Sequence, residues 1–253
     1  MTARNLVDHA VGALSIALFV SLWEGVVRAG WVNPVLFPPP SVVARDFIEY
    51  AVRGEMSEDV LWSLSRIVVG FSVGAAAGVL MGVLTGGNRL ASRFFSPLFH
   101  MLRPIPPIAF VPIVIVWFGL SELGKWFLVF WGVFFTVWLS AHLGVQRVNE
   151  TLVRAARSLG APPRRLLLEV LLPGALPFIF VGIRTAVSVS FFTLVAAELA
   201  GAFSGIAYRL EVTQQNMQVG RMISGLILLG LVATVADRLF GLVSAKIVHW
   251  QAS

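Results

Sequence analysis

The chain has 253 residues, of which 57% are hydrophobic even before its 23 glycines are counted. Soluble domains reach roughly 45–50% with glycine included, so these values exclude a soluble globular protein and favour one polytopic membrane domain over residues 1–253. No cysteine is present, which excludes disulfides, thiolate metal sites and cysteine nucleophiles. The net charge is +6, and basic excess in a membrane protein normally marks cytoplasmic loops, so nucleic acid is not an expected partner.

Long apolar blocks predict six membrane-spanning helices, because a helix needs about 20 residues to cross a bilayer. Barrel strands are shorter and alternate in hydropathy, so the expected fold is all-α. We interpret the first block as a retained span, since no convincing signal-peptide cleavage site follows it. The blocks lie near residues 10–27, 59–84, 105–118, 126–145, 176–199 and 223–246.

The basic residues outside these spans predict the orientation. Ten lie on the side of both termini: Arg4, Arg89, Arg93, Arg103, Arg147, Arg154, Arg157, Arg164, Arg165 and Lys246. Six lie on the other side: Arg28, Arg45, Arg53, Lys125, Arg209 and Arg221. The positive-inside rule then predicts a multi-pass protein of the bacterial cytoplasmic (inner) membrane, with both termini in the cytoplasm.

Prolines mark two irregular segments. The three prolines before Ser41 exclude regular helix, and Ser41 is a sensible N-cap for a short external helix; a plain connector is the alternative. Around Pro106 the third span begins broken. Irregular backbone at membrane depth is tolerated where it lines a cavity, so this stretch either lines a path or forms a simple kink.

Glycines recur at every fourth position of the second span and form one ridge along the predicted helix. Such a ridge of small residues favours close helix packing within a bundle or at a subunit interface, more than direct contact with a substrate. The ridge consists of Gly70, Gly74, Gly78, Gly82 and Gly86.

Residues 119–125 fit the core of a phosphate-binding loop, but Trp126 stands where a Ser or Thr belongs and no strand precedes the segment. Nucleotide binding is therefore not expected here. The histidines, His9, His100, His142 and His249, show no ligand spacing, so neither a metal site nor a catalytic triad is predicted.

The segment 147–173 predicts a helical hairpin on the cytoplasmic side. An apolar stripe at helical spacing is formed by Leu152, Ala155, Ala156 and Leu159. Gly160 suits the left-handed position after a helix, and Pro162 and Pro163 can open a second helix that runs to Pro173. The stripe needs either a protein partner or the lipid surface.

This segment resembles the EAA loop of permease subunits of bacterial ABC importers, through Ala155-Ala156, Gly160 and Leu172-Pro173. Arg154 replaces the Glu of that motif, and Glu150 lies one turn earlier. The whole chain is similar to the nitrate/sulfonate/taurine branch of these permeases, through segments at 37–41, 63–66 with 70–71, 103–106, 117–119 with Glu122 and Lys125, and 197–198.

The resemblance implies the type I ABC importer permease fold, in which the EAA loop is the coupling helix that contacts an ATPase. It also implies three kinds of partner: a second copy of the permease, two ATPase subunits that hold ATP and Mg²⁺, and an extracytoplasmic solute-binding protein. The solute would be a small anion or polar compound resembling nitrate, a sulfonate or taurine. The expected ATPase contacts are Ala155, Ala156, Arg157, Leu159, Gly160, Ala161, Pro162, Arg164 and Arg165.

Ionisable residues inside a span are functional candidates by default. On the fifth span, one stripe holds Arg184, Ser188, Phe191, Val195 and Glu198. Our candidates for the translocation path or its gates are Arg184, Ser188, Phe191, Glu198 and Pro106. Arg184 and Glu198 are about 21 Å apart along the helix and cannot pair with each other. A snorkelling arginine and an interfacial glutamate are the structural alternatives.

A secondary transporter or channel working without an ATPase is the alternative function. Such a protein would be expected to show inverted-repeat halves or a charged relay deep in several spans. Neither feature is visible in the sequence.

Overall fold

The computed structural model describes residues 3–247, and over these residues the chain consists of helices joined by turns, with no strand. The all-α prediction is confirmed. The long helices are α1 (Ala3–Arg28), α3 (Glu55–Gly87), α6 (Glu122–Gln146), α9 (Leu172–Leu199) and α11 (Val219–Ile247). The shorter elements are α2 (Pro40–Val52), α4 (Arg89–Leu102), η1 (Pro107–Phe110), α5 (Val111–Phe118), α7 (Glu150–Ser158), α8 (Pro163–Arg165), η2 (Leu166–Leu171) and α10 (Ile206–Gln215).

Four helical stretches of the described chain are long and apolar enough to cross a membrane: α3, α6, the continuous stretch Pro163–Leu199, and Val219–Ser244 within α11. A fifth candidate is the pair formed by α4 and residues 107–118, which meet at an angle of 87°. The remaining predicted span, 10–27, lies within α1. All six apolar blocks are therefore helical, although the third is not a straight span.

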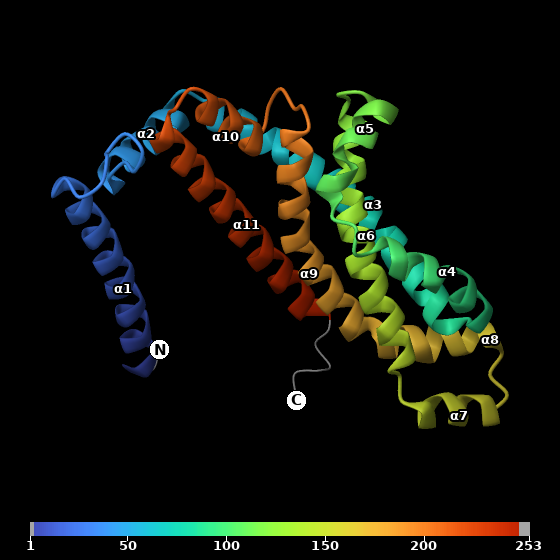
Figure 1. Cartoon of the computed structure of the whole chain (residues 1–253). Coiled ribbons are helices and arrows are strands. Elements are labelled where there is room, and N and C mark those ends of the chain that lie inside the picture. The colour runs from blue at the N-terminus through green and yellow to red at the C-terminus, as the bar shows by residue number, and fades with distance from the viewer. Residues whose placement is uncertain (1–2, 248–253) are drawn as a thin grey trace.

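The long helices run between two ends of the molecule. Figure 1 shows α2, α5 and α10 together at one end and α7 at the other, where α11 also ends and α1 begins. We call these the α10 end and the α7 end. Helix α1 stands apart from the other long helices over most of its length and joins them at the α10 end.

The core forms where α6 packs between α3 and α9. Leu128, Val133 and Trp138 of α6 are completely buried. The glycine row of α3 lies against α6: a Cβ atom added at Gly78 would lie 2.8 Å from the carbonyl oxygen of Phe134. Only glycine lets the two backbones approach this closely, so the row sets the distance between the helices.

Prolines account for two differences from the predicted elements. The predicted span at 105–118 is only η1 and α5, too short to cross a bilayer alone, because the prolines at 104, 106 and 107 interrupt the helix after α4. Conversely, Pro173 and Pro177 do not interrupt the chain, and the predicted second hairpin helix and fifth span form one helix from Pro163 to Leu199. Just before Pro173, in the π-helical turn η2, Leu172 N–H donates to Leu167 O, five residues earlier. This wider hydrogen-bond spacing lets the helix continue through the prolines.

Helix α2, at the α10 end, does not begin with the N-cap that the sequence predicts. Pro39 is the N-cap of α2 and Ser41 is a residue of the helix itself. The backbone N–H and the hydroxyl of Ser41 both donate to the carboxylate of Glu24, at 3.0 and 2.8 Å. Ser41 therefore ties α1 to α2, and the proline at the first helical position supplies the start instead.

Candidate functional site

Helix α7 is an amphipathic helix at its end of the molecule, where it lies against η2. The Asn149 side chain caps it by accepting from Thr151 N–H at 2.9 Å. None of its residues is buried, and Leu152 and Leu159 of the predicted stripe are 57% and 88% exposed. Apolar side chains this exposed indicate a surface that another molecule covers.

A Schellman motif ends α7 at Gly160. Gly160 N–H donates to Arg157 O at 3.0 Å, and Ala161 N–H donates to Ala156 O at 3.1 Å. Gly160 has φ +77°, in the left-handed region that favours glycine. The turn directs the chain from α7 into Pro162 and Pro163, which open the long helix ending at Leu199.

The remaining predicted contact residues of this segment are also accessible. Arg157 and Ala161 line an apolar groove of about 450 Å³ beside the last turns of α3. Arg164 and Arg165 are exposed, and Arg165 lies 3.4 Å from Glu169. Arg154 pairs with Glu150 at 2.9 Å, so these two residues neutralise each other on the surface of α7.

A second groove, of about 480 Å³, runs along α6 and α9. Pro106, one of the residues predicted to line the translocation path, lines this groove beside Arg103 and Pro107. Hydroxyl groups of Thr136 and Ser140 also line it, and each donates back to a carbonyl oxygen of its own helix, at 2.9 and 3.2 Å. A hydroxyl oxygen remains able to accept, so the groove is apolar with a few polar positions, as solute sites commonly are.

The residues of the predicted stripe on α9 do not line this groove. Some of them are exposed and others are buried. Arg184 and Ser188 are exposed, and Arg184 pairs with Asp237 of α11 at 3.0 Å. Phe191 is buried in the core and Glu198 is completely buried. The groove is lined instead by the neighbouring face of α9, with Thr185, Val189, Phe192 and Thr193.

Glu198 belongs to a buried polar cluster at the α10 end. Its Oε1 atom accepts from Ser63 at 2.6 Å and from Arg66 Nη1 at 2.9 Å. Its Oε2 atom accepts from Ala207 N–H at 2.8 Å. A carboxylate with this many donors is satisfied without water, so Glu198 holds α9, α3 and the start of α10 together.

Arg66 is the centre of this cluster and is 1% exposed. Its Nε and Nη2 atoms donate to the two carboxylate oxygens of Glu122, at 2.8 and 2.9 Å. Nη1 also donates to Ser204 O at 2.6 Å. We call Ser63, Arg66, Glu122, Lys125 and Glu198 the Arg66 cluster.

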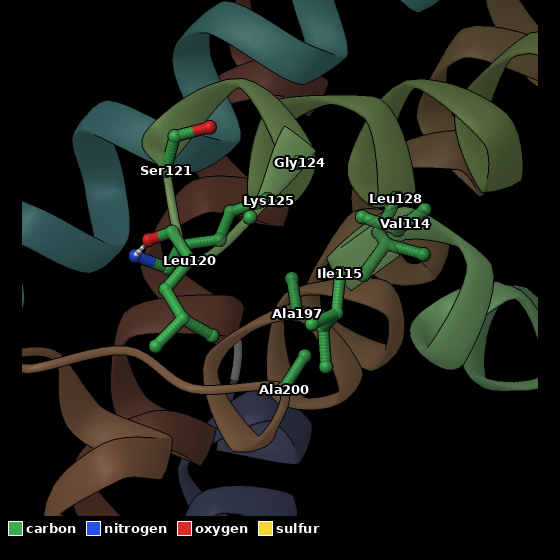
Figure 2. Close-up of a pocket in the computed structure, with 10 residues that line it drawn as sticks. Val114, Ile115, Leu120, Ser121, Gly124, Lys125, Leu128, Ala197 and Ala200 are labelled. Carbon is green, nitrogen blue, oxygen red and sulfur yellow. Dashed lines mark hydrogen bonds between the residues drawn. The ribbon is translucent and has the colours of Figure 1, made fainter. Parts of the chain in front are cut away.

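Lys125, the lysine of the apparent phosphate loop, is engaged within the protein. Its Nζ atom donates to Glu122 at 2.8 Å and to Leu120 O at 3.3 Å, the bond drawn in Figure 2. The cavity beside it holds about 10 Å³ and is lined mainly by apolar side chains such as Val114 and Leu128. That is roughly the space of one water molecule.

The sequence reading missed Arg66 as a site residue. The signal was available, because a charged residue inside an apolar span needs a partner. Its partners Glu122 and Glu198 lie 56 and 132 residues away in the chain, so no local pattern links them.

A third concave region lies at the α10 end, around Arg209 and Tyr50. Although burial opposes it, the bond from Arg209 Nε to Asp59, at 2.8 Å, raises the pKa of Arg209. Burial and the hydrogen bond to Asp59 raise the pKa of the Tyr50 hydroxyl. Both side chains therefore stay protonated donors at neutral pH.

Residues 74–249 match the family model described as the binding-protein-dependent transport system inner membrane component. The chain is 31% identical over 242 residues to the putative aliphatic sulfonates transport permease protein SsuC of Bacillus subtilis, covering 96% of this chain and 88% of that protein. It is 29% identical over 249 residues to the taurine transport system permease protein TauC of Escherichia coli, covering 96% and 90%. Among solved structures, a chain of the inward-facing MetNI methionine ABC transporter aligns with a TM-score of 0.63 and 20% identity, covering 75% of this chain and 94% of that one.

Proposed function

The chain belongs to the family of binding-protein-dependent transport system inner membrane components and is a permease subunit of an ABC importer, and from this premise we propose that its solute is a small sulfonate or a related polar anion. Permeases of this family work in the membrane with a separate ATPase and a solute-binding protein. The names of SsuC and TauC, which refer to aliphatic sulfonates and taurine, support this choice of solute.

Helix α7 is the proposed contact with the ATPase. The observation that carries this assignment is its exposure, with Leu152 and Leu159 uncovered on a helix whose ends are fixed by Asn149 and by Gly160. In this proposal ATP and Mg²⁺ are held by the ATPase. Movement of α7 passes through η2 into α9, because residues 163–199 form one helix.

The groove along α6 and α9 is the proposed wall of the translocation path, with Pro106 at its rim and a second copy of the permease opposite. Almost none of the apolar length of α11 is buried within one chain, whereas most of α6 is. Phe192, within the groove, is 75% exposed. Surfaces this apolar require lipid or another chain, and a homodimer places two copies of the groove face to face. Two copies of α7 would then receive two ATPase subunits.

The α7 end is the proposed cytoplasmic side. The excess of Lys and Arg in the segments at that end supports this orientation. Helix α1 begins and α11 ends there, so both termini would lie in the cytoplasm. The α10 end would then face the solute-binding protein.

Uptake into proteoliposomes tests this function. The permease, its ATPase and its solute-binding protein are reconstituted, and uptake of radiolabelled taurine and ethanesulfonate is measured with and without ATP on the ATPase side. We expect uptake that requires all three components and ATP. Uptake driven by an ion gradient in vesicles without the ATPase would contradict the assignment and support a secondary transporter.

A further inference from the structure

A pocket of about 200 Å³ lies at the α10 end and shares no lining residue with the groove along α6 and α9. It is formed where the end of α2, the start of α3, helix α10 and the turn into α11 meet. Three arginines from three of these segments line it: Arg53, Arg209 and Arg221. We call it the arginine pocket.

Two of these arginines share a single carboxylate. Arg53 Nη2 and Arg221 Nη2 both contact Glu49 Oε1, the second at 3.2 Å. One negative charge thus faces two guanidinium groups. The side chains of Arg53 and Arg221 are 52% and 33% exposed, so a solute can reach both.

The third arginine is held in place from behind. Arg209 Nε donates to Asp59 Oδ2, and Asp59 is almost completely buried. The oxygens of Asp59 are also engaged by Tyr50 Oη at 2.6 Å and Gly205 N–H at 2.9 Å. Glu55 is the one carboxylate lining the pocket and lies 3.4 Å from Arg209 Nη1, longer than a full-strength hydrogen bond.

The turn between α10 and α11 completes the pocket with neutral polar groups. Asn216 and Gln218 line it on either side of Met217, which has φ +54°. A methionine in the left-handed region is strained, and such strain is common where a turn holds side chains at a binding site. Gln218 N–H donates to Thr213 O at 2.8 Å, and Gln218 Oε1 lies 3.4 Å from Arg221 Nη1.

We propose that the arginine pocket is a binding site for a small organic oxyanion, a sulfonate or carboxylate. The planar fork of an arginine matches the oxygens of these groups, and two accessible guanidinium groups sharing one carboxylate leave donors for them. A volume of about 200 Å³ is below the usual range for drug-sized ligands, so the ligand has few heavy atoms.

The pocket is connected to the Arg66 cluster through the protein. Arg209 donates to Asp59, which also accepts from Gly205 N–H, and Ala207 N–H, two residues further along, donates to Glu198. A bound oxyanion therefore stabilises the α10 end as a unit. This site is separate from the groove of the proposed transport path, with which it shares no lining residue.

Equilibrium binding tests the proposal. The complex of the permease with its ATPase is placed in lipid nanodiscs without ATP or the solute-binding protein, and titrated calorimetrically with sodium ethanesulfonate. We expect saturable binding at one site per permease chain and a raised melting temperature. Ethylammonium chloride is the control titrant and should give no saturable binding.

Paired variants locate the site. Arg53→Gln combined with Arg221→Gln should weaken ethanesulfonate binding about tenfold or more, whereas Arg45→Gln, an exposed arginine of the same helix α2 outside the pocket, should not change it. Arg53→Gln alone, at the most exposed position, serves if the double variant does not fold. Absence of saturable binding, or equal loss in Arg45→Gln, would overturn the proposal.

Two further outcomes separate this site from its alternatives. In one outcome, the solute-binding protein needs the arginines to associate, while ethanesulfonate does not bind. The arginines then recognise an acidic side chain of that protein, and the proposal of an oxyanion site is wrong. If uptake of the radiolabelled solute proceeds normally but the titration shows no binding, only the arginine pocket fails and the transport function stands.

Discussion

Arg66 uses each N–H group of its guanidinium inside the protein. Nε and Nη2 bond Glu122, Nη1 bonds Glu198 and Ser204 O, and Nη2 also approaches the Ser204 hydroxyl at 3.4 Å. A buried arginine is tolerated because every donor is matched. The same matching makes its removal costly, since the buried Glu198 would lose its cation and the partly exposed Glu122 would keep only Lys125.

Replacing Arg66 by methionine should therefore lower the free energy of unfolding by about 3–5 kcal/mol. Arg154→Met is the matched control, because Arg154 also pairs with a glutamate but is 72% exposed, and it should cost under about 1 kcal/mol. Chemical unfolding of the detergent-solubilised protein, followed by tryptophan fluorescence, measures both. Equal losses would show that the Arg66 cluster does not stabilise the fold.

At the scale of elements, the contact between α3 and α6 depends on the absence of side chains. A Cβ atom at Gly82 would overlap that of Ala141 and lie 2.8 Å from Trp138 O. Five glycines repeat this arrangement along α3, so the two helices are fixed over most of their length.

Gly82→Ala should destabilise the protein by about 1–3 kcal/mol, because the added methyl group forces the backbones apart. At Gly230 of α11 no atom lies within 4 Å of an added Cβ, and Gly230→Ala should be neutral or stabilise by up to about 1 kcal/mol through helix propensity. Thermal unfolding of both variants measures these changes in stability. A stabilising Gly82→Ala would mean that α3 and α6 are not held by this row.

The turn after α7 supports a second prediction at this scale. Gly160→Val should abolish solute uptake while the spans remain folded, because a β-branched residue at φ +77° costs about 1–3 kcal/mol and distorts the end of α7. Gly30→Val is the control, since Gly30 has φ +78° and equally open surroundings at the other end of the molecule. Uptake and ATPase association are measured for both, and wild-type uptake by an assembled Gly160→Val complex would contradict the coupling role of α7.

At the scale of the whole molecule, the exposed apolar groove predicts a symmetric pair. The natural chain contains no cysteine, so a single introduced cysteine reports one contact unambiguously. Phe192→Cys, within the groove, should form a disulfide-linked dimer on mild oxidation in membranes. Val52→Cys, 81% exposed on α2, should stay monomeric on denaturing gels, and the opposite pattern would place the second copy elsewhere.

The sequence predicted what depends on local pattern. Apolar length located the helices, the spacing of small residues located the tight contact of α3, and Gly160 with its prolines located the end of α7. The sequence did not predict that one helix would run through Pro173 and Pro177. The hydrogen-bond spacing changes in η2, just before these prolines, and the apolar pattern does not reveal that change. Periodicity grouped Arg184 with Glu198 on one face of α9, but one faces Asp237 and the other Arg66, and only the fold decides which neighbour each meets.

The π-helical turn η2 lies along the chain between α7 and the groove-lining face of α9. A π turn holds one more residue than an α turn, and each residue of an α-helix corresponds to a rotation of about 100° about the axis. The six residues Leu166–Leu171 thus accommodate one residue more than ordinary α-helical spacing would between Pro163 and the groove-lining face of α9. Removing a single residue there would restore ordinary helical spacing while leaving α7 and that face of α9 in nearly the same rotational relation.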